Sequence, residues 1–285
     1  MAKQIKRKPA TKRRSTKKKT FFSGWIISFI ITFFILLIIG ITAYHYRDAL
    51  AYYFSFRSKH AIENSNATKV EEARIYQVLK RHDKKVFGFD VSEYQGKINW
   101  EEITTIEDTF QLKFVFVRAT AGKDKVDRRF KQNWIKAKEN GFVRGAYHYY
   151  RPNENSIEQA TNFIKTVKLK KGDFPPVLDI ENLPKTQSID SLKVGLKRWL
   201  KKVENHYNVK PIIYSGESYY KDFLADEFDG YTFWIANYNF FVEDIKDHWT
   251  IWQFTEKGTV PGIEGPVDIN IYNGTPKMLN YMLLQ

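Results

Sequence analysis

Residues 175–181 have the sequence PPVLDIE, in which two prolines open a short apolar run that ends in two carboxylates. Such a run is typical of a strand in a parallel sheet that is buried on both faces. On an extended strand, residues two positions apart share a face. We therefore expect a strand over residues 177–181, with Asp179 and Glu181 on one face and Ile180 on the other.

Strand-like and helix-like stretches alternate on both sides of this segment. The predicted strands cover residues 86–91, 114–120, 145–150, 177–181, 211–215, 232–237, 250–254 and 267–270. The predicted helices lie between the earlier strands only, at residues 128–140, 156–167 and 188–206. This order predicts an α/β fold: an irregular (β/α) TIM-like barrel with a reduced helix set in its second half.

Four acidic residues stand in or at the ends of these apolar runs, namely Asp90, Asp179, Glu181 and Asp268. A buried carboxylate is costly unless it is paired, hydrogen-bonded or used in chemistry. Functional residues of such barrels lie at the C-terminal ends of the strands, and the first and eighth strands are neighbours. We therefore expect Asp90 and Asp268 to lie close together.

Two carboxylates on one face suit chemistry at a glycosidic bond. One acid protonates the leaving oxygen, and a second carboxylate stabilises the developing positive charge. Neighbouring carboxylates repel, so the pKa of one should rise and favour a protonated acid at neutral pH. Two non-catalytic interpretations stay open: an Asp-x-Glu pair at a solvated edge, and an aspartate that caps the following helix.

The net charge of +14 is concentrated at the start of the 285-residue chain. Residues 1–20 hold ten Lys or Arg and no acid, and subtracting these ten leaves +4 for residues 21–285. No nucleic-acid partner is predicted, because the basic character rests on the tail alone. The absence of cysteine excludes disulfides, thiolate catalysis and Cys-based metal sites, and the six His show no HExxH spacing. We expect no metal and no organic cofactor.

Residues 21–46, with the sequence FFSGWIISFIITFFILLIIGITAYHY, contain no charged residue. At ~1.5 Å per residue they give roughly 39 Å of helix, more than the ~30 Å hydrocarbon core of a lipid bilayer needs. The preceding basic tail should stay in the cytoplasm and could touch anionic lipids. We predict a single-pass cell-membrane protein, with a cleaved signal peptide as an alternative that the long apolar stretch disfavours.

These features divide the chain into four parts. They are a basic cytoplasmic tail (1–20), a transmembrane helix (21–46), a stalk or linker (47–85) and an outward-facing barrel domain (86–285). Residues 70–79 have helical periodicity, so we expect a short helix within the stalk.

Several ordered motifs of the outer domain resemble those of glycoside hydrolase family 25, the Chalaropsis-type lysozymes or N-acetylmuramidases. They are GFDVSEYQG at 88–96, RAT at 118–120, GAYHY at 145–149, PVLDIE at 176–181, WIANY at 234–238, WQF at 252–254 and VDIN at 267–270. The resemblance covers roughly residues 86–284. Two departures are mild: Phe89 replaces a more usual aliphatic residue, and Glu93 adds an acid that could alter the local potential.

The resemblance implies cleavage of the β-1,4 bond between N-acetylmuramic acid and N-acetylglucosamine in the glycan strands of peptidoglycan, for local cell-wall remodelling. It implies that Glu181 is the general acid and that Asp179 orients and stabilises a charged intermediate. Asp90 and Asp268 would maintain the electrostatic potential of the site and hold the substrate. Either the acetamide of the sugar attacks, with Asp179 steadying it, or water attacks in a direct inverting displacement.

Aromatic residues near the predicted strand ends could line a glycan cleft, with core packing as the alternative for each. They are Tyr94, Tyr147, Tyr149, Tyr214, Trp234, Tyr238 and Trp252. The matched motifs give Tyr147 and Trp252 the strongest functional case. Two rival functions remain: a glycosidase acting on chitin-like polymers, and a non-catalytic cell-wall glycan-binding module.

Overall fold

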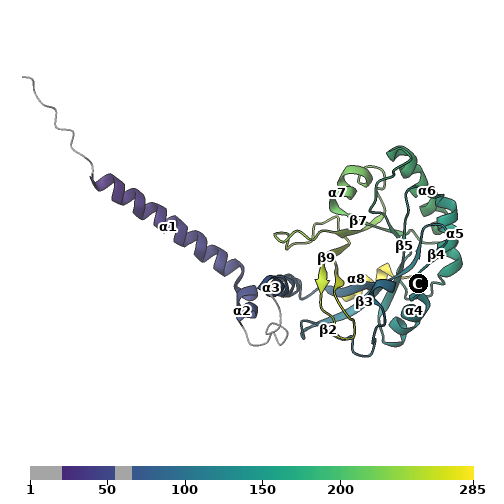
Figure 1. Cartoon of the computed structure of the whole chain (residues 1–285), viewed down its shortest axis with the longest axis horizontal. Helices are drawn as coiled ribbons and strands as arrows, with labels where there is room; N and C mark the ends of the chain where they lie inside the picture. Colours follow the sequence, from purple (N-terminus) through teal and green to yellow (C-terminus); the bar gives the residue numbers. More distant parts are fainter. Residues whose placement is uncertain (1–20, 55–65) are drawn as a thin grey trace, which may run out of the picture. The chain divides into compact units, whose positions relative to one another are not determined.

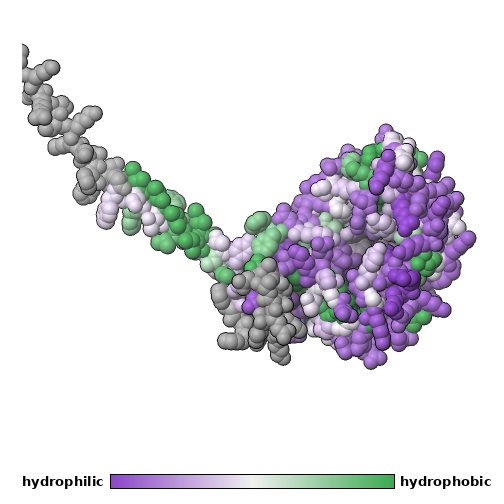
Figure 2. Space-filling view, in the orientation of Figure 1, coloured by the Kyte–Doolittle hydropathy of each residue, from purple (hydrophilic) through white to green (hydrophobic). Residues whose placement is uncertain are grey.

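The computed structural model describes residues 21–54 and 66–285, so the predicted basic tail lies outside the described residues. The chain divides into two compact units, Met1–Arg47 and Asp48–Gln285. In the first unit, helix α1 (Phe21–His45) forms over the uncharged stretch and exposes apolar side chains from Trp25 onward (Figure 2). Its segment Trp25–His45, with a mean hydropathy of 2.8, is long and apolar enough for a membrane span or a signal sequence.

The second unit contains a closed barrel of eight strands (Figure 1). The strands are β1 (Val86–Val91), β3 (Phe110–Ala121), β5 (Val143–Tyr149), β6 (Val177–Asp179), β7 (Ile212–Gly216), β8 (Thr232–Ala236), β9 (Ile251–Gly258) and β10 (Val267–Tyr272). The barrel closes because β1 pairs with both β3 and β10. Two short strands, β2 (Thr105–Ile106) and β4 (Lys125–Val126), pair with β3 outside this ring. The predicted eight-stranded barrel is confirmed.

Long helices follow the earlier strands, as the sequence predicts. They are α4 (Phe130–Glu139), α5 (Ser156–Thr166) and α6 (Ile189–Tyr207). The other helical elements of the barrel are short, namely η1 (Glu93–Gln95) after β1, α7 (Glu217–Tyr219) and η2 (Tyr220–Leu224) after β7, and α8 (Pro276–Met282) at the end. Helix α6 illustrates why the long helices form, because its buried residues recur at the spacing of one apolar face and Ser188 caps its first turn.

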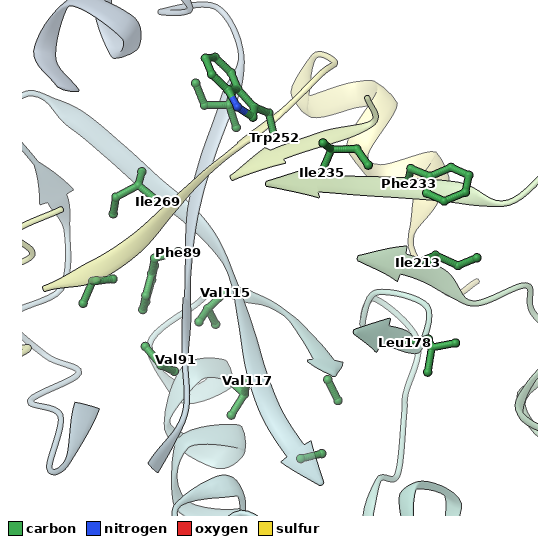
Figure 3. Packing of buried hydrophobic residues seen from close by; sticks show 14 of the residues in the cluster. Phe89, Val91, Val115, Val117, Leu178, Ile213, Phe233, Ile235, Trp252 and Ile269 are labelled. Carbon is green, nitrogen blue, oxygen red and sulfur yellow. The ribbon is translucent and has the colours of Figure 1, made fainter. Parts of the chain in front are cut away.

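The strands bury both faces, because successive side chains point to opposite sides. Phe114 and Phe116 of β3 join a cluster that also holds Trp234. Val115 and Val117 alternate with these two residues along the strand. They join a larger cluster that also contains residues of α4, α5 and α6. Figure 3 shows part of this larger cluster, including Val115 and Val117.

The last strand, β10, runs opposite to the other strands of the barrel. The barrel strands from β1 through β3 and on to β9 pair in parallel, whereas β10 is antiparallel to both β9 and β1. The start of β10 therefore lies at the rim where β1 ends, and Asp268 pairs in register with Asp90. The predicted proximity of these two acids is confirmed, although Asp268 stands near the beginning of its strand.

Helix α3 (Asn66–Arg81) is the helix expected in the stalk, but it packs on the barrel domain and belongs to the same compact unit. Ile75, Val78 and Leu79, which share its apolar face, are buried in the larger hydrophobic cluster. Helix α3, which precedes the boundary expected at residue 85, thus contributes to the core of the domain. Helix α2 (Arg47–Phe54) precedes it, and residues 55–65 between them lie outside the described residues.

Candidate active site

A cleft of about 470 Å³ opens at the barrel rim and collects the acidic residues singled out in the sequence. Its lining includes Asp90, Asp179, Glu181 and Asp268. Asp90 and Asp179 stand near or at the carboxyl ends of β1 and β6, while Asp268 reaches the same rim from the start of β10. The site thus gathers carboxylates from three strands.

Asp179 and Glu181 lie close enough for each to shift the pKa of the other, although they differ in exposure. Asp179 is buried and ends β6, whereas Glu181 lies two residues beyond the strand and is exposed in the cleft. The predicted strand over 177–181 is therefore two residues too long. The Oδ1 atom of Asp179 is buried and accepts no hydrogen bond from the described residues.

Desolvation controls the protonation of this pair. Burial, followed by the charge of Glu181, raises the pKa of Asp179 well above its usual range. Desolvation also raises the pKa of Glu181, although hydrogen bonds with Asp179 and Tyr214 oppose that rise. The pair therefore holds a proton more strongly than two separate solvated carboxyl groups do. The repulsion expected from the sequence contributes, but burial is the larger cause.

Asp90 is fixed by two amide side chains. Its Oδ2 accepts a 2.8 Å hydrogen bond from Gln253 Nε2 and a 2.7 Å hydrogen bond from Asn270 Nδ2. The Oε1 atom of Gln253 in turn accepts from the hydroxyl of Tyr214 at 2.7 Å and from that of Tyr238. These bonds orient Gln253 so that its amide nitrogen faces the carboxylate.

The second amide is oriented by an indole. Trp234 Nε1 donates to Asn270 Oδ1 at 2.8 Å, which leaves Asn270 Nδ2 free to donate to Asp90. Burial and then the charge of Asp268 raise the pKa of Asp90 well above its usual range, although both amides oppose the rise. Asp90 is thus a buried carboxylate with a fixed orientation.

Asp268 is less enclosed than Asp90. Burial raises its pKa to about 6, and the charge of Glu256, another residue of the cleft lining, acts in the same direction. Glu256 was not singled out in the sequence, because it lies in the exposed end of a strand and no spacing marks it.

Six of the seven predicted aromatic residues line the cleft: Tyr94, Tyr147, Tyr149, Tyr214, Trp234 and Tyr238. Tyr94 is the most exposed of the six, at 76%. Its ring lies 4.6 Å from the guanidinium carbon of Arg118, which is also part of the lining. Trp234 is almost fully buried and stacks on Phe116, so it supports the floor of the cleft more than its surface.

The structure contradicts the cleft-lining role expected of Trp252. This residue is completely buried in the larger hydrophobic cluster (Figure 3). Its ring contacts those of Trp249 and Phe254. Because side chains alternate along β9, Gln253 is the residue of this motif that faces the site. The same alternation, applied to the motif at residues 252–254, could have identified Gln253 from the sequence.

Glu93 does not add free negative charge to the cleft. Its carboxylate contacts Lys125 at 2.6 Å, Arg128 at 2.9 Å and Arg118 at 3.4 Å. Hydrogen bonds from Lys125 and Arg128 lower the pKa of Glu93 to about 2. The expected change in local potential is therefore largely neutralised by these three cations, and Arg118 is held beside Tyr94 by Glu93 and by Asp127 at 3.0 Å.

A mixed eight-stranded barrel with a carboxylate pair in a rim cleft lined by aromatic residues is the architecture of a glycoside hydrolase. The sequence profile of "Glycosyl hydrolases family 25" matches residues 89–263, and the chain belongs to this family.

Two relatives illustrate the similarity in sequence. The chain is 30% identical to Lysozyme M1 of Streptomyces globisporus over 210 residues, which cover 68% of this chain and 70% of that protein. It is 42% identical to the protein YegX of Escherichia coli K12 over 196 residues, which cover 68% of this chain and 72% of that protein.

Two solved structures share the fold of the barrel domain. A family 25 glycosyl hydrolase from Bacillus anthracis superposes with a TM-score of 0.63 at 27% identity, covering 71% of this chain and 95% of that one. A bacterial lysozyme from Streptomyces coelicolor superposes with a TM-score of 0.62 at 28% identity, covering 70% of this chain and 97% of that one.

Proposed function

We propose that the protein is a peptidoglycan hydrolase that cleaves the β-1,4 bond between N-acetylmuramic acid and N-acetylglucosamine. The observation that carries this proposal is the proton-holding pair of Asp179 and Glu181 in an aromatic-lined cleft. Membership of family 25 and similarity to proteins named lysozymes support the choice of substrate.

In the proposed reaction, Glu181 protonates the glycosidic oxygen as the bond to the sugar carbon breaks. The acetamide oxygen of the same sugar attacks that carbon and forms a cyclic intermediate, whose N–H donates to Asp179. The unpartnered Oδ1 of Asp179 supports this step, because a buried acceptor is stabilised by a donor that the substrate supplies. Glu181, now ionised, takes a proton from water as the water opens the intermediate.

Asp90 and Asp268 support this reaction through charge. Asp90 is held by two amides and lies beside Asp268, so both carboxylates can stabilise positive charge that develops on the sugar. Tyr94, Tyr147, Tyr149, Tyr214 and Tyr238 are proposed to bind the glycan, with Trp234 supporting the floor of the cleft.

The product ends test the proposed function. The full-length protein, purified in detergent, is incubated with purified peptidoglycan, and the new reducing ends are converted to sugar alcohols and identified by mass spectrometry. We expect muramic acid at these ends. Glucosamine ends, or release of sugar from chitin only, would instead indicate a different glycosidase. Glycan binding without any release would support the non-catalytic module.

We further propose that α1 anchors the protein in the cell membrane, with the barrel domain outside and the basic tail in the cytoplasm. The length and apolarity of α1 support this arrangement, as does the location of peptidoglycan outside the membrane. Anchoring would restrict cleavage to nearby wall and so suit local remodelling. Protease added to spheroplasts should digest the barrel domain, and full protection of the domain would contradict this topology.

Replacement of Asp268 with asparagine should change how stability depends on pH. Because folding raises the pKa of Asp268 to about 6, the folded state binds its proton more tightly than the unfolded chain does. The contribution of Asp268 to the free energy of unfolding should therefore fall as pH rises from about 4 to about 6, by about 2 kcal/mol, since one pKa unit corresponds to about 1.4 kcal/mol. Urea unfolding between pH 4 and pH 8 measures this contribution, which D268N should lack.

The matched control for this measurement is D124N, at an exposed aspartate outside the cleft lining. Its unfolding curves should keep the wild-type dependence on pH. Identical pH dependence in D268N and the wild type would contradict the assignment to Asp268.

A further inference from the structure

Arg74 of α3 forms hydrogen bonds with the loop between β8 and β9. We name residues 237–250 the β8–β9 loop, which contains no helix or strand. The buried guanidinium of Arg74 donates to the carbonyl of Phe240 at 3.1 Å through Nε and to that of Asn239 at 3.0 Å through Nη2. Its Nη1 donates to the carbonyl of Phe254 in β9 at 3.2 Å. One side chain thus ties the loop to the neighbouring strand.

The following turns of α3 continue this attachment. Gln77 Nε2 donates to Glu243 Oε1 at 3.1 Å, and the ring Nε2 of His82 lies 2.8 Å from the carbonyl oxygen of Glu243. Arg81 forms a two-pronged ion pair with Asp244, at 2.6 and 2.7 Å. The loop is therefore fastened to α3 from Asn239 to Asp244, and the planar guanidinium groups suit this fixed geometry.

The β8–β9 loop carries a residue of the candidate active site. Tyr238 lines the cleft and precedes Asn239, whose carbonyl Arg74 holds. The hydroxyl of Tyr238 donates to Gln253, and Gln253 donates to Asp90. A continuous series of contacts thus joins α3 to the carboxylate at the centre of the site.

Helix α3 lies outside the part of the chain that the family profile matches. The matched family region begins at residue 89, whereas α3 spans Asn66–Arg81. A loop of this length without regular structure has many alternative conformations, so its placement depends on the contacts that hold it. Removal of Arg74 would release four backbone carbonyls, those of Asn239, Phe240, Val242 and Phe254.

We propose that α3, through Arg74, is a positioning element of the active site: it holds the β8–β9 loop so that Tyr238 stands in the cleft. Glycan binding then depends on the segment that leads from the membrane helix into the barrel. Arg74 touches no substrate and acts through Tyr238. This inference rests on the proposed function only for the nature of the ligand, because the placement of the loop can be measured without any reaction.

The first test compares R74A with R144A in the full-length protein in detergent. Arg144 is an equally buried arginine near the start of β5, where it binds Asp173 and the carbonyl of Trp134, and it does not line the cleft. Hydrogen exchange, followed by mass spectrometry, should accelerate at least about tenfold in residues 237–250 of R74A. In R144A, by contrast, the loop should keep wild-type exchange even if the melting temperature falls.

The second test measures catalysis. In R74A, KM for soluble peptidoglycan fragments should rise about tenfold with kcat within about threefold of wild type, because lost substrate binding appears in KM. Y238A should show a similar rise in KM. The KM of the double variant R74A/Y238A should exceed that of Y238A alone by less than about twofold. R144A should leave KM unchanged.

The outcomes separate this inference from the proposed function. Loop exchange in R74A equal to that in R144A, or additive losses in the double variant, would overturn the positioning role. A wild-type protein without hydrolytic activity, combined with faster loop exchange in R74A, would refute the proposed function and retain the positioning role. If R74A does not fold, R81A takes its place. This variant removes the exposed ion pair with Asp244, and it must accelerate hydrogen exchange at residues 243–245.

Discussion

Replacement of Glu181 with glutamine should lower kcat on peptidoglycan by about 10²–10⁴-fold, the usual contribution of a general acid. Glutamine keeps the size and the hydrogen-bonding capacity of the side chain but has no proton to give to the leaving oxygen. KM should change by less than about threefold, because the sugar contacts of the cleft remain. Release of reducing ends from purified peptidoglycan by the full-length protein measures both constants.

The control for this experiment is E158Q, the same exchange at an exposed glutamate near the start of α5. It should keep wild-type kcat and KM. Circular dichroism should show that both variants keep the wild-type fold. If E181Q retains more than about a tenth of wild-type kcat, Glu181 is not the general acid and the proposed mechanism fails.

Replacement of Asp179 with asparagine should lower kcat by about 10²–10³-fold, the scale on which a fixed electrostatic group contributes to catalysis. The asparagine amide fits the same space but lacks the charge that stabilises a cationic intermediate. Its amide also cannot supply two acceptor oxygens to the acetamide N–H and to Glu181 together. D124N, already the control for pH dependence, serves again here, and its kcat should equal that of the wild type.

The stereochemistry of the first product decides which role Asp179 has. Attack by the acetamide, followed by water, retains the β configuration at the sugar carbon, whereas direct attack by water inverts it. Proton NMR of the reaction within its first minutes should therefore show the β-anomer before mutarotation. Initial formation of the α-anomer would rule out the acetamide pathway and would make Asp179 the base that activates water.

Much of the site could be predicted because its pattern is local. The two-residue spacing of Asp179 and Glu181 places both side chains on one side of an extended segment, whichever strands lie beside it. Apolar runs of four to seven residues likewise predicted the eight strands. The ordered motifs of the barrel domain then identified the family to which the comparisons assign the chain.

The predictions that failed depended on relations that the local pattern does not contain. Trp252 was assigned to the cleft because it lies in a family motif, but alternation along β9 places it in the hydrophobic cluster and Gln253 in the cleft. The periodicity of residues 70–79 predicted the apolar face of α3 but not its partner. That face is covered by the barrel, so the expected stalk helix is part of the folded domain.

The sequence by itself determined the strand order along the chain, the apolar helix, and the pairing of Asp179 with Glu181, because each depends on neighbours within a few residues. The antiparallel direction of β10 likewise follows from its short connection to β9, residues 259–266, because a parallel pair needs a longer crossover. Only the tertiary structure decided how Asp90 is held. Gln253 and Asn270, which bind Asp90, lie 163 and 180 positions away from it. Hydrogen bonds over such separations depend on which strands become neighbours, and no local periodicity records that choice.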